Sequence, residues 1–246
     1  FFKFSLVMRA FYQKYLSASI IQHLLNTVFF PYFVIILMSK RLSLELWGEL
    51  LFIQGLSSLF LIFLNMGIEF HGTRAIASNK EDHKLVGGYN FVKIINSIII
   101  LSLGLLLIIF GVISSNLFYL SLLLSISISL NPSWVFLAKK NIQPMLYIDI
   151  FYKILFISFI YYFIRDDDLG AYYIYFLSSN NFLIVISGLI YLKYKYSFQP
   201  LNLTNYLITV KDLSSLFLYQ ISGIAPLMLP VIFLGFMSDF RSVAIF

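Results

Sequence analysis

Amide side chains interrupt the long apolar runs of this sequence, and they are the first residues to which chemistry can be assigned. Asn26 lies in the middle of the first run, Gln54 in the second and Gln220 in the last. Amides within apolar helices either hydrogen-bond a polar ligand in a cavity or bond one another between helices. The sequence leaves both interpretations open for each of them.

Prolines lie close to several polar positions. Pro31 is in the first run, Asn131 directly precedes Pro132 in the fourth, and Pro226 and Pro230 are in the last. Proline removes one backbone hydrogen bond and clashes with the carbonyl group four residues before it. We therefore expect a kink at Pro31 and breaks in the other two runs, a pattern typical of helices that surround a transport site.

Asp149 and Lys153 are four residues apart near the start of the fifth run. This spacing places both side chains on one helical face, where they can pair. A lone charge at the middle of a membrane helix costs about 3 kcal/mol on insertion scales, and less near the interface. Two interpretations stay open: a cation-coupling carboxylate with an anion-contacting lysine, or a pair whose charged ends reach the inner boundary.

Motifs of nucleotide-dependent and hydrolytic enzymes are missing from the sequence. It has no GxxxxGK[ST], GxSxG, HExxH or GxGxxG pattern, and no cysteine. Its three histidines, His23, His71 and His83, lie in different segments, which argues against a metal site. We expect no enzymatic activity and no cofactor, and any energy must come from a gradient or a separate subunit.

The composition predicts an all-α membrane protein with several spanning helices. Of 246 residues, 60% are apolar and 11% charged, whereas a soluble domain is about 25% charged. A spanning helix needs about 20 mostly apolar residues, and continuous runs without alternation exclude barrel strands. Seven segments qualify: Leu16–Met38, Gly48–Met66, Val92–Ile113, Leu117–Ala138, Tyr147–Ile164, Ala171–Leu192 and Leu216–Met237.

The distribution of Lys and Arg predicts a cytoplasmic N-terminus. With that orientation, the inner segments hold 12 of the 17 basic residues, the outer segments hold four, and Lys153 lies within a helix. The net charge of +6 is then explained by basic residues that orient the chain in the membrane, so we expect no nucleic-acid partner. The inner residues are Lys3, Arg9, Lys14, Arg74, Lys80, Lys84, Lys93, Lys139, Lys140, Lys193, Lys195 and Lys211; the outer ones are Lys40, Arg41, Arg165 and Arg241.

The charged segment after the second run, GIEFHGTRAIASNK, carries Arg74 at its centre. Its apolar positions Ile68, Gly72, Ala75 and Ile76 fall on one helical face. The segment is either a short helix on the inner surface, where basic residues favour anionic headgroups, or a solvated loop that obeys the positive-inside rule.

The longest inner segment, residues 193–215, is polar and predicts a linker between two lobes. Residues 1–192 then form a six-helix lobe, and residues 216–246 begin a second one. Because the first lobe has an even number of membrane spans, the second lobe also starts on the cytoplasmic side, and the two lobes form a parallel repeat. The chain opens on Phe1 and stops just after an apolar run, so we interpret it as a fragment of a longer protein.

Three motifs together resemble those of one transporter family. They are NTVFFPY (residues 26–32) followed by Trp47-Gly48 and Gln54, MGIEF and GTRAIA (residues 66–77), and NPSWVF (residues 131–136). Their order and spacing look like those of O-antigen flippases in the polysaccharide-transporter family, over nearly the whole chain. The family usually has Asp before the tryptophan and Gln-Gly after the aromatic pair, where this chain has Ser133 and Leu137-Ala138.

The resemblance implies a multi-pass protein with a fold like that of multidrug and toxin extruders. It implies a flippase that moves undecaprenyl-pyrophosphate-linked oligosaccharide to the outer leaflet of a bacterial inner membrane. Implied partners are membrane lipid, the O-antigen polymerase and the chain-length regulator, with H⁺ or Na⁺ as the candidate coupling ion. The expected cavity residues are Asn26, Pro31, Gln54, Arg74, Lys93, Asn131, Trp134, Asp149, Lys153 and Gln220, with Arg74 at the inner mouth.

Other functions fit parts of the pattern less well. An ion-coupled drug or metabolite exporter of the same fold needs cavity carboxylates on the early helices, and the first two runs have none apart from Glu49 at the very start of the second. A membrane enzyme acting on the same lipid-linked sugar needs a large outer loop, and the longest one here, Ser39–Trp47, has about nine residues. A structural scaffold needs no buried amides.

Overall fold

The computed structural model describes residues 18–78, 82–196, 206–237 and 240–245, and these ranges contain helices and no strand. Six helices within them are long and apolar enough to cross a membrane, and a bent pair makes up to seven. The chain is therefore a polytopic helical membrane protein, as predicted. The start of the first predicted run at Leu16, linker residues 197–205 and the basic residues Lys3, Arg9, Lys14 and Lys80 lie outside the described residues.

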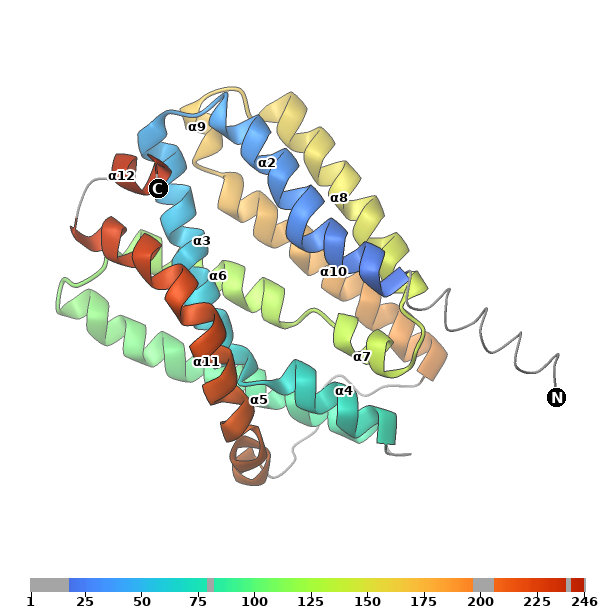
Figure 1. Cartoon of the computed structure of the whole chain (residues 1–246). Helices are drawn as coiled ribbons and strands as arrows, with labels where there is room; N and C mark the ends of the chain where they lie inside the picture. The colour runs from blue at the N-terminus through green and yellow to red at the C-terminus, as the bar shows by residue number, and fades with distance from the viewer. Residues whose placement is uncertain (1–17, 79–81, 197–205, 238–239, 246) are drawn as a thin grey trace.

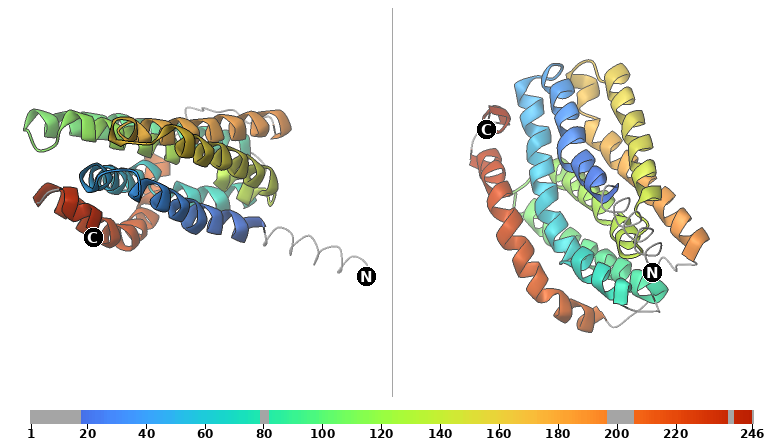
Figure 2. Two further views of the ribbon diagram at one scale, coloured as in Figure 1. Left: turned by 90° about the horizontal axis from the view of Figure 1, so that it is seen from above. Right: turned by 45° about the vertical axis from the view of Figure 1, so that its right-hand side comes forward.

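The helices form one bundle with α3 near its centre, flanked by α2 on one side and α11 on the other (Figures 1 and 2). The α2–α3 turn and α9 lie together at one end of the bundle, while α4 and α7 lie at the other (Figure 1). The elements are η1 (Leu25–Phe29), α2 (Phe30–Ser39), α3 (Leu44–Asn65), α4 (Ile68–Ser78), α5 (Asp82–Ile109), α6 (Ser115–Ser129), α7 (Ser133–Ala138), α8 (Gln143–Phe163), α9 (Asp167–Gly170), α10 (Tyr173–Tyr196), α11 (Tyr206–Met237) and α12 (Phe240–Ile245).

Prolines interrupt the helices as their backbone chemistry requires. Before Pro31 the first spanning helix widens into the π-turn η1, where the N–H of Phe30 bonds the carbonyl of Leu25 five residues back. This wider turn accommodates the proline, and the helix continues as one span, Ala18–Ser39, instead of kinking sharply. The fourth run does break, because α6 ends before Pro132, and in the last run two helical pieces meet at 61° around Pro226.

The second run continues past its predicted end at Met66. Met66 and Gly67 have φ angles of 43° and 81°, which end α3, and α4 begins directly afterwards. The helical interpretation of this segment is confirmed, with Ile68, Gly72 and Ile76 buried. This helix does not only lie at the end of the bundle, because it also packs against α7.

The segment between α10 and α11 is shorter than the predicted linker, residues 193–215. Helix α10 continues to Tyr196, and α11 begins at Tyr206. Leu216, where the second lobe was predicted to start, therefore lies within α11. Helices α11 and α12 both pack on α3, so the start of the predicted second lobe lies against the first six spans.

Lys93 corrects the predicted count of inner-loop charges. Helix α5 begins at Asp82, ten residues before the predicted Val92, so Lys93 lies well inside the helix and is 1% exposed. Its amine donates to the carbonyl oxygen of Ser129 at the C-terminus of α6. Terminal carbonyls lack partners within their own helix, and a cation there satisfies one of them.

Arg41 holds together the end of the bundle that carries α9. Its guanidinium donates to three carbonyl oxygens at the C-terminus of α8, those of Ile160 at 3.1 Å, Tyr161 at 2.7 Å and Ile164 at 2.7 Å. The backbone N–H of Ser43 donates to a carboxylate oxygen of Asp167 at 2.8 Å. These contacts join the α2–α3 turn to the connection between α8 and α10.

We expect Arg41→Ala to lower the free energy of unfolding by about 1.5–3 kcal/mol, the usual contribution of a hydrogen bond to a charged group. The α8 carbonyls lose their donor, and the two connections come apart more easily. The melting temperature of the purified protein in detergent measures the effect. The neighbouring exposed Lys40→Ala is the control, and equal melting temperatures for the two variants would contradict this role.

Candidate functional site

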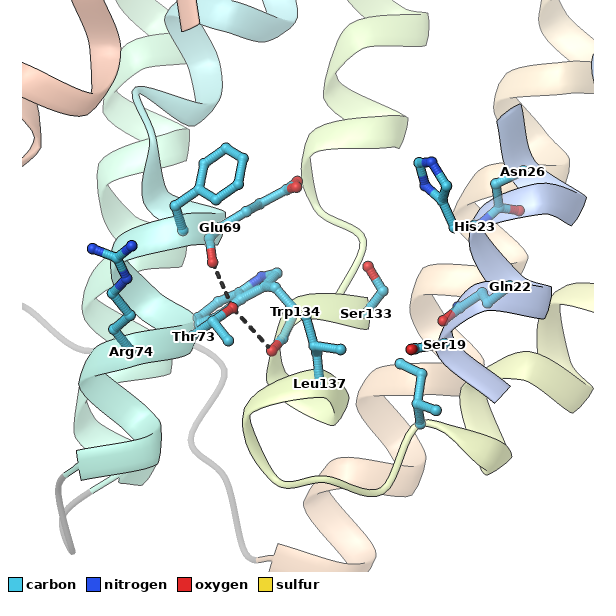
Figure 3. Close-up of a pocket in the computed structure, with 12 residues that line it drawn as sticks. Ser19, Gln22, His23, Asn26, Glu69, Thr73, Arg74, Ser133, Trp134 and Leu137 are labelled. Atoms are coloured by element: carbon cyan, nitrogen blue, oxygen red, sulfur yellow. Dashed lines mark hydrogen bonds between the residues drawn. The ribbon is translucent and has the colours of Figure 1, made fainter. Parts of the chain in front are cut away.

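A cleft of about 380 Å³ lies at the end of the bundle opposite Arg41, between the first spanning helix, α4 and α7 (Figure 3). Hydroxyl, amide, imidazole and charged groups alternate with apolar side chains around it. The lining residues are Ser19, Gln22, His23, Asn26, Glu69, Phe70, Thr73, Arg74, Ser133, Trp134, Leu137 and Ile142. We call this the polar cleft.

The first spanning helix supplies one wall of the polar cleft through Ser19, Gln22, His23 and Asn26. These positions are three or four residues apart, so they share one helical face. Figure 3 shows them on the side of the cleft opposite α4. These four polar side chains make one face of an otherwise apolar helix polar, and this face forms the wall.

Helix α4 supplies the opposite wall through two pairs four residues apart, Glu69 with Thr73 and Phe70 with Arg74. The hydroxyl of Thr73 donates to the carbonyl of Glu69 at 2.5 Å and lies 3.4 Å from the carbonyl oxygen of Trp134. Arg74 is exposed at the edge of the cleft, on the side of α4 turned away from His23 (Figure 3). Its guanidinium is therefore open to solvent at the edge of the cleft.

The third wall is α7, and the helix break at Asn131-Pro132 creates it. The Asn131 side-chain oxygen accepts the N–H of Ser133 at 2.9 Å and so satisfies a donor at the start of α7. Trp134 is 4% exposed, and its ring lies edge-on to Tyr89 with centroids 5.7 Å apart. A Cβ at Gly72 would come within 2.5 Å of the Trp134 ring, so glycine allows α4 to approach α7.

Charged groups stand directly behind the first helix. Asp149 is 2% exposed and accepts a hydrogen bond from the Gln22 amide at 2.6 Å. Lys153 donates to the side-chain oxygen of Asn26. Asp149 and Lys153 interact electrostatically but form no direct salt bridge, and each hydrogen-bonds an amide that lines the polar cleft.

The other predicted cavity residues lie elsewhere. Gln54 is hydrogen-bonded to the Tyr173 side chain, and the Gln220 side-chain oxygen accepts the N–H of Gly67 at 2.9 Å. Pro31 sits in the first turn of α2. These are helix-to-helix contacts and backbone roles, the alternative that the sequence left open for intramembrane amides.

The structure thus brings three of the predicted residues to the wall of the polar cleft: Asn26, Arg74 and Trp134. Asp149 and Lys153 lie one hydrogen bond behind it, while Lys93 and Asn131 hold α7 and its neighbours in place. Sequence reasoning did not assign Ser19, Gln22, His23, Glu69, Thr73 and Ser133 to the site. Their spacing of three, four or seven residues indicates that several of them share a helical face. The cleft itself forms only because α4, α7 and the first helix lie next to one another.

A metal centre has no support in this part of the molecule. Among the described residues, no group of three or more His, Asp or Glu side chains could hold a metal ion.

Comparison with known proteins finds no matching family model and no match among curated proteins or solved structures. The O-antigen flippase resemblance therefore stays a prediction, carried by the residues of this chain.

Proposed function

We propose that the chain belongs to a flippase that moves undecaprenyl-pyrophosphate-linked O-antigen repeat units from the inner to the outer leaflet of a bacterial inner membrane. The polar cleft is the observation that carries this proposal. A sugar–pyrophosphate headgroup is too polar for the bilayer core, so its carrier needs a cavity of hydrogen-bonding groups between spanning helices. The polyprenyl tail, in contrast, can remain in lipid.

The side chains around the polar cleft match such a headgroup. The amides of Gln22 and Asn26 and the hydroxyls of Thr73 and Ser133 both donate and accept hydrogen bonds, as sugar hydroxyls do. Arg74 offers a planar, permanently charged donor set that suits pyrophosphate oxygens. We assign these groups to headgroup binding and Arg74 to the mouth of the cleft.

The proposed orientation places the polar cleft at the cytoplasmic end, where the lipid-linked unit is made. With Lys93 moved into the interior, 11 basic residues remain on the inner side against four on the outer. Helix α11 then begins a second lobe related to the first by a parallel repeat, as in multidrug and toxin extruders. Alternate opening of the two lobes carries the headgroup across, next to the O-antigen polymerase and chain-length regulator.

A second candidate function, an ion-coupled exporter of the same fold, gains support from one observation. The only carboxylate within the first two runs, Glu49, does not line the polar cleft, but the second helix continues through α4, and Glu69 does line it. Glu69 accepts a hydrogen bond from Asn65 at 3.2 Å, and Asp149 lies behind Gln22. These carboxylates are candidates for binding H⁺, Na⁺ or a cationic substrate.

Deletion of the full-length gene in its host separates the two functions. We expect loss of the lipopolysaccharide ladder on a gel, with single lipid-linked repeat units accumulating on the cytoplasmic face. Re-expression of the gene should restore the ladder, which excludes an effect on neighbouring genes. A normal ladder together with increased sensitivity to toxic cations would contradict the flippase and support the exporter.

A further inference from the structure

A second cleft, of about 270 Å³, lies between the first spanning helix and α8. Apart from Lys153, every residue that lines it is apolar, including Leu25, Phe29, Phe33, Ile154 and Ile157. Phe29, Phe33 and Ile154 are 54%, 53% and 59% exposed, so the cleft is open on the outer surface of these membrane-spanning helices. We call it the apolar cleft.

One contact joins the apolar cleft to the polar cleft. Asn26 lines the polar cleft, Lys153 lines the apolar cleft, and the amine of Lys153 donates to the side-chain oxygen of Asn26. The amine also lies 4.8 Å from the centroid of the Phe30 ring. The two clefts are therefore connected through the hydrogen bond between Lys153 and Asn26.

The π-turn η1 builds this junction. Its five residues include Asn26, which faces the polar cleft, and Leu25 and Phe29, which line the apolar cleft. Single π-turns inside α-helices are frequent at functional sites, because the extra residue per turn changes which side chains share a face. Here the turn lets one short segment contribute to two clefts of opposite polarity.

We propose that the two clefts and Lys153 form one binding site for a single-chain lipid phosphate. Its apolar chain occupies the apolar cleft, its phosphate replaces Asn26 as the partner of Lys153, and its polar headgroup extends into the polar cleft. The Lys153 amine hydrogen-bonds a neutral amide and interacts with Asp149 without a direct salt bridge. A phosphate would give this cation a directly hydrogen-bonded charged partner. The inference rests on the proposed function, in which Arg74 meets the headgroup at the mouth of the polar cleft, and it adds where the lipid portion and its phosphate bind inside.

The shape of the apolar cleft decides between two sources of lipid phosphate. It is a single slot between two helices, which suits one chain, whereas the bulk phospholipids of a bilayer carry two. We therefore commit to a single-chain lipid such as a prenyl phosphate. Phosphatidylglycerol, an anionic lipid with two chains, is the competitor that tests this choice.

Binding of radiolabelled farnesyl phosphate to the purified full-length protein in neutral detergent tests the site. We expect Lys153→Gln to weaken farnesyl phosphate binding roughly tenfold, the loss of one charge-assisted contact, and to leave farnesol binding unchanged. Lys153→Arg should retain most of the affinity for the phosphate. Unchanged farnesol binding shows at the same time that the Lys153→Gln protein is folded.

A matched pair of tryptophan substitutions tests the apolar cleft. Ile154 lines it, whereas the adjacent Leu155 is 49% exposed and lines neither cleft. We expect Ile154→Trp to weaken both ligands by filling the cleft, and Leu155→Trp to bind as the wild type does. The site is overturned if the two tryptophan variants bind alike, if Lys153→Gln binds farnesyl phosphate normally, or if phosphatidylglycerol displaces it as well as unlabelled farnesyl phosphate.

The outcome for this site is distinguishable from the outcome for the proposed function. The binding measurement contains no sugar and no transport step, so it succeeds or fails independently of the lipopolysaccharide phenotype. Normal lipopolysaccharide after gene deletion, with farnesyl phosphate bound as expected, rejects the O-antigen flippase and keeps a lipid phosphate site. Loss of the ladder with no effect of Lys153→Gln or Ile154→Trp on binding keeps the flippase and rejects this site.

Discussion

Arg74→Ala is expected to reduce surface O-antigen at least roughly tenfold without changing the amount of protein in the membrane. Arg74 is exposed on α4, so its removal costs little stability. Charge-assisted hydrogen bonds contribute about 1.5–3 kcal/mol each, which corresponds to about ten- to hundredfold in affinity for the pyrophosphate. Lipopolysaccharide gels and immunoblots of the membrane fraction measure both quantities.

Two further variants show whether position and geometry matter at Arg74. Arg74→Lys keeps the charge but loses the planar donor set, so it should restore O-antigen only in part. Arg241 is also exposed, lies 4.0 Å from Glu45 and is far from the polar cleft, so Arg241→Ala should leave O-antigen normal. Normal O-antigen in Arg74→Ala cells would remove Arg74 from the site.

Trp134→Ala is expected to produce the largest loss of stability, about 3–5 kcal/mol, which is typical when a large buried aromatic side chain is truncated. Trp134 fills the space between Gly72 of α4 and Tyr89 of α5, and the Lys93 amine lies 6.0 Å from its ring centroid. Removal leaves a cavity at the point where three helices meet. Thermal unfolding of the purified protein in detergent should show a much lower melting temperature.

The control for Trp134→Ala lies on the same short helix. Leu137 is smaller and 37% exposed, against 4% for Trp134, so Leu137→Ala removes much less buried surface and should lower the melting temperature less. Trp134→Phe keeps an aromatic ring and should fall between the two. Equal melting temperatures for Trp134→Ala and Leu137→Ala would show that α7 is not held by this side chain.

Together these variants separate binding from folding at the polar cleft. Arg74→Ala should lose transport in a protein of normal stability, because its side chain lies at the edge of the cleft. Trp134→Ala should lose stability first, and any transport defect follows from the loosened walls. A transport measurement on Trp134 variants is therefore interpretable only beside their melting temperatures.

The sequence alone determined the class of the molecule. Twenty-residue apolar runs can only satisfy their backbone in lipid as helices, so the polytopic helical architecture follows from composition and length. The helix breaks near Asn131 and Pro226 were also predictable, because proline cannot donate a backbone hydrogen bond wherever the chain places it. The apolar face of GIEFHGTRAIASNK identified a helix for the same reason, since its period of 3.6 is a local property.

The tertiary structure alone decided which polar residues meet. Gln54, Gln220 and Asn26 are amides in similar apolar runs, yet only Asn26 lines the polar cleft, because the direction of a side chain depends on which neighbour its helix face contacts. Asp149 and Lys153 share one helical face by sequence and interact electrostatically, but each makes its direct hydrogen bond to an amide of the first helix instead of a salt bridge to the other. Helix periodicity states which residues share a face, whereas only packing between helices distant in sequence states what that face touches.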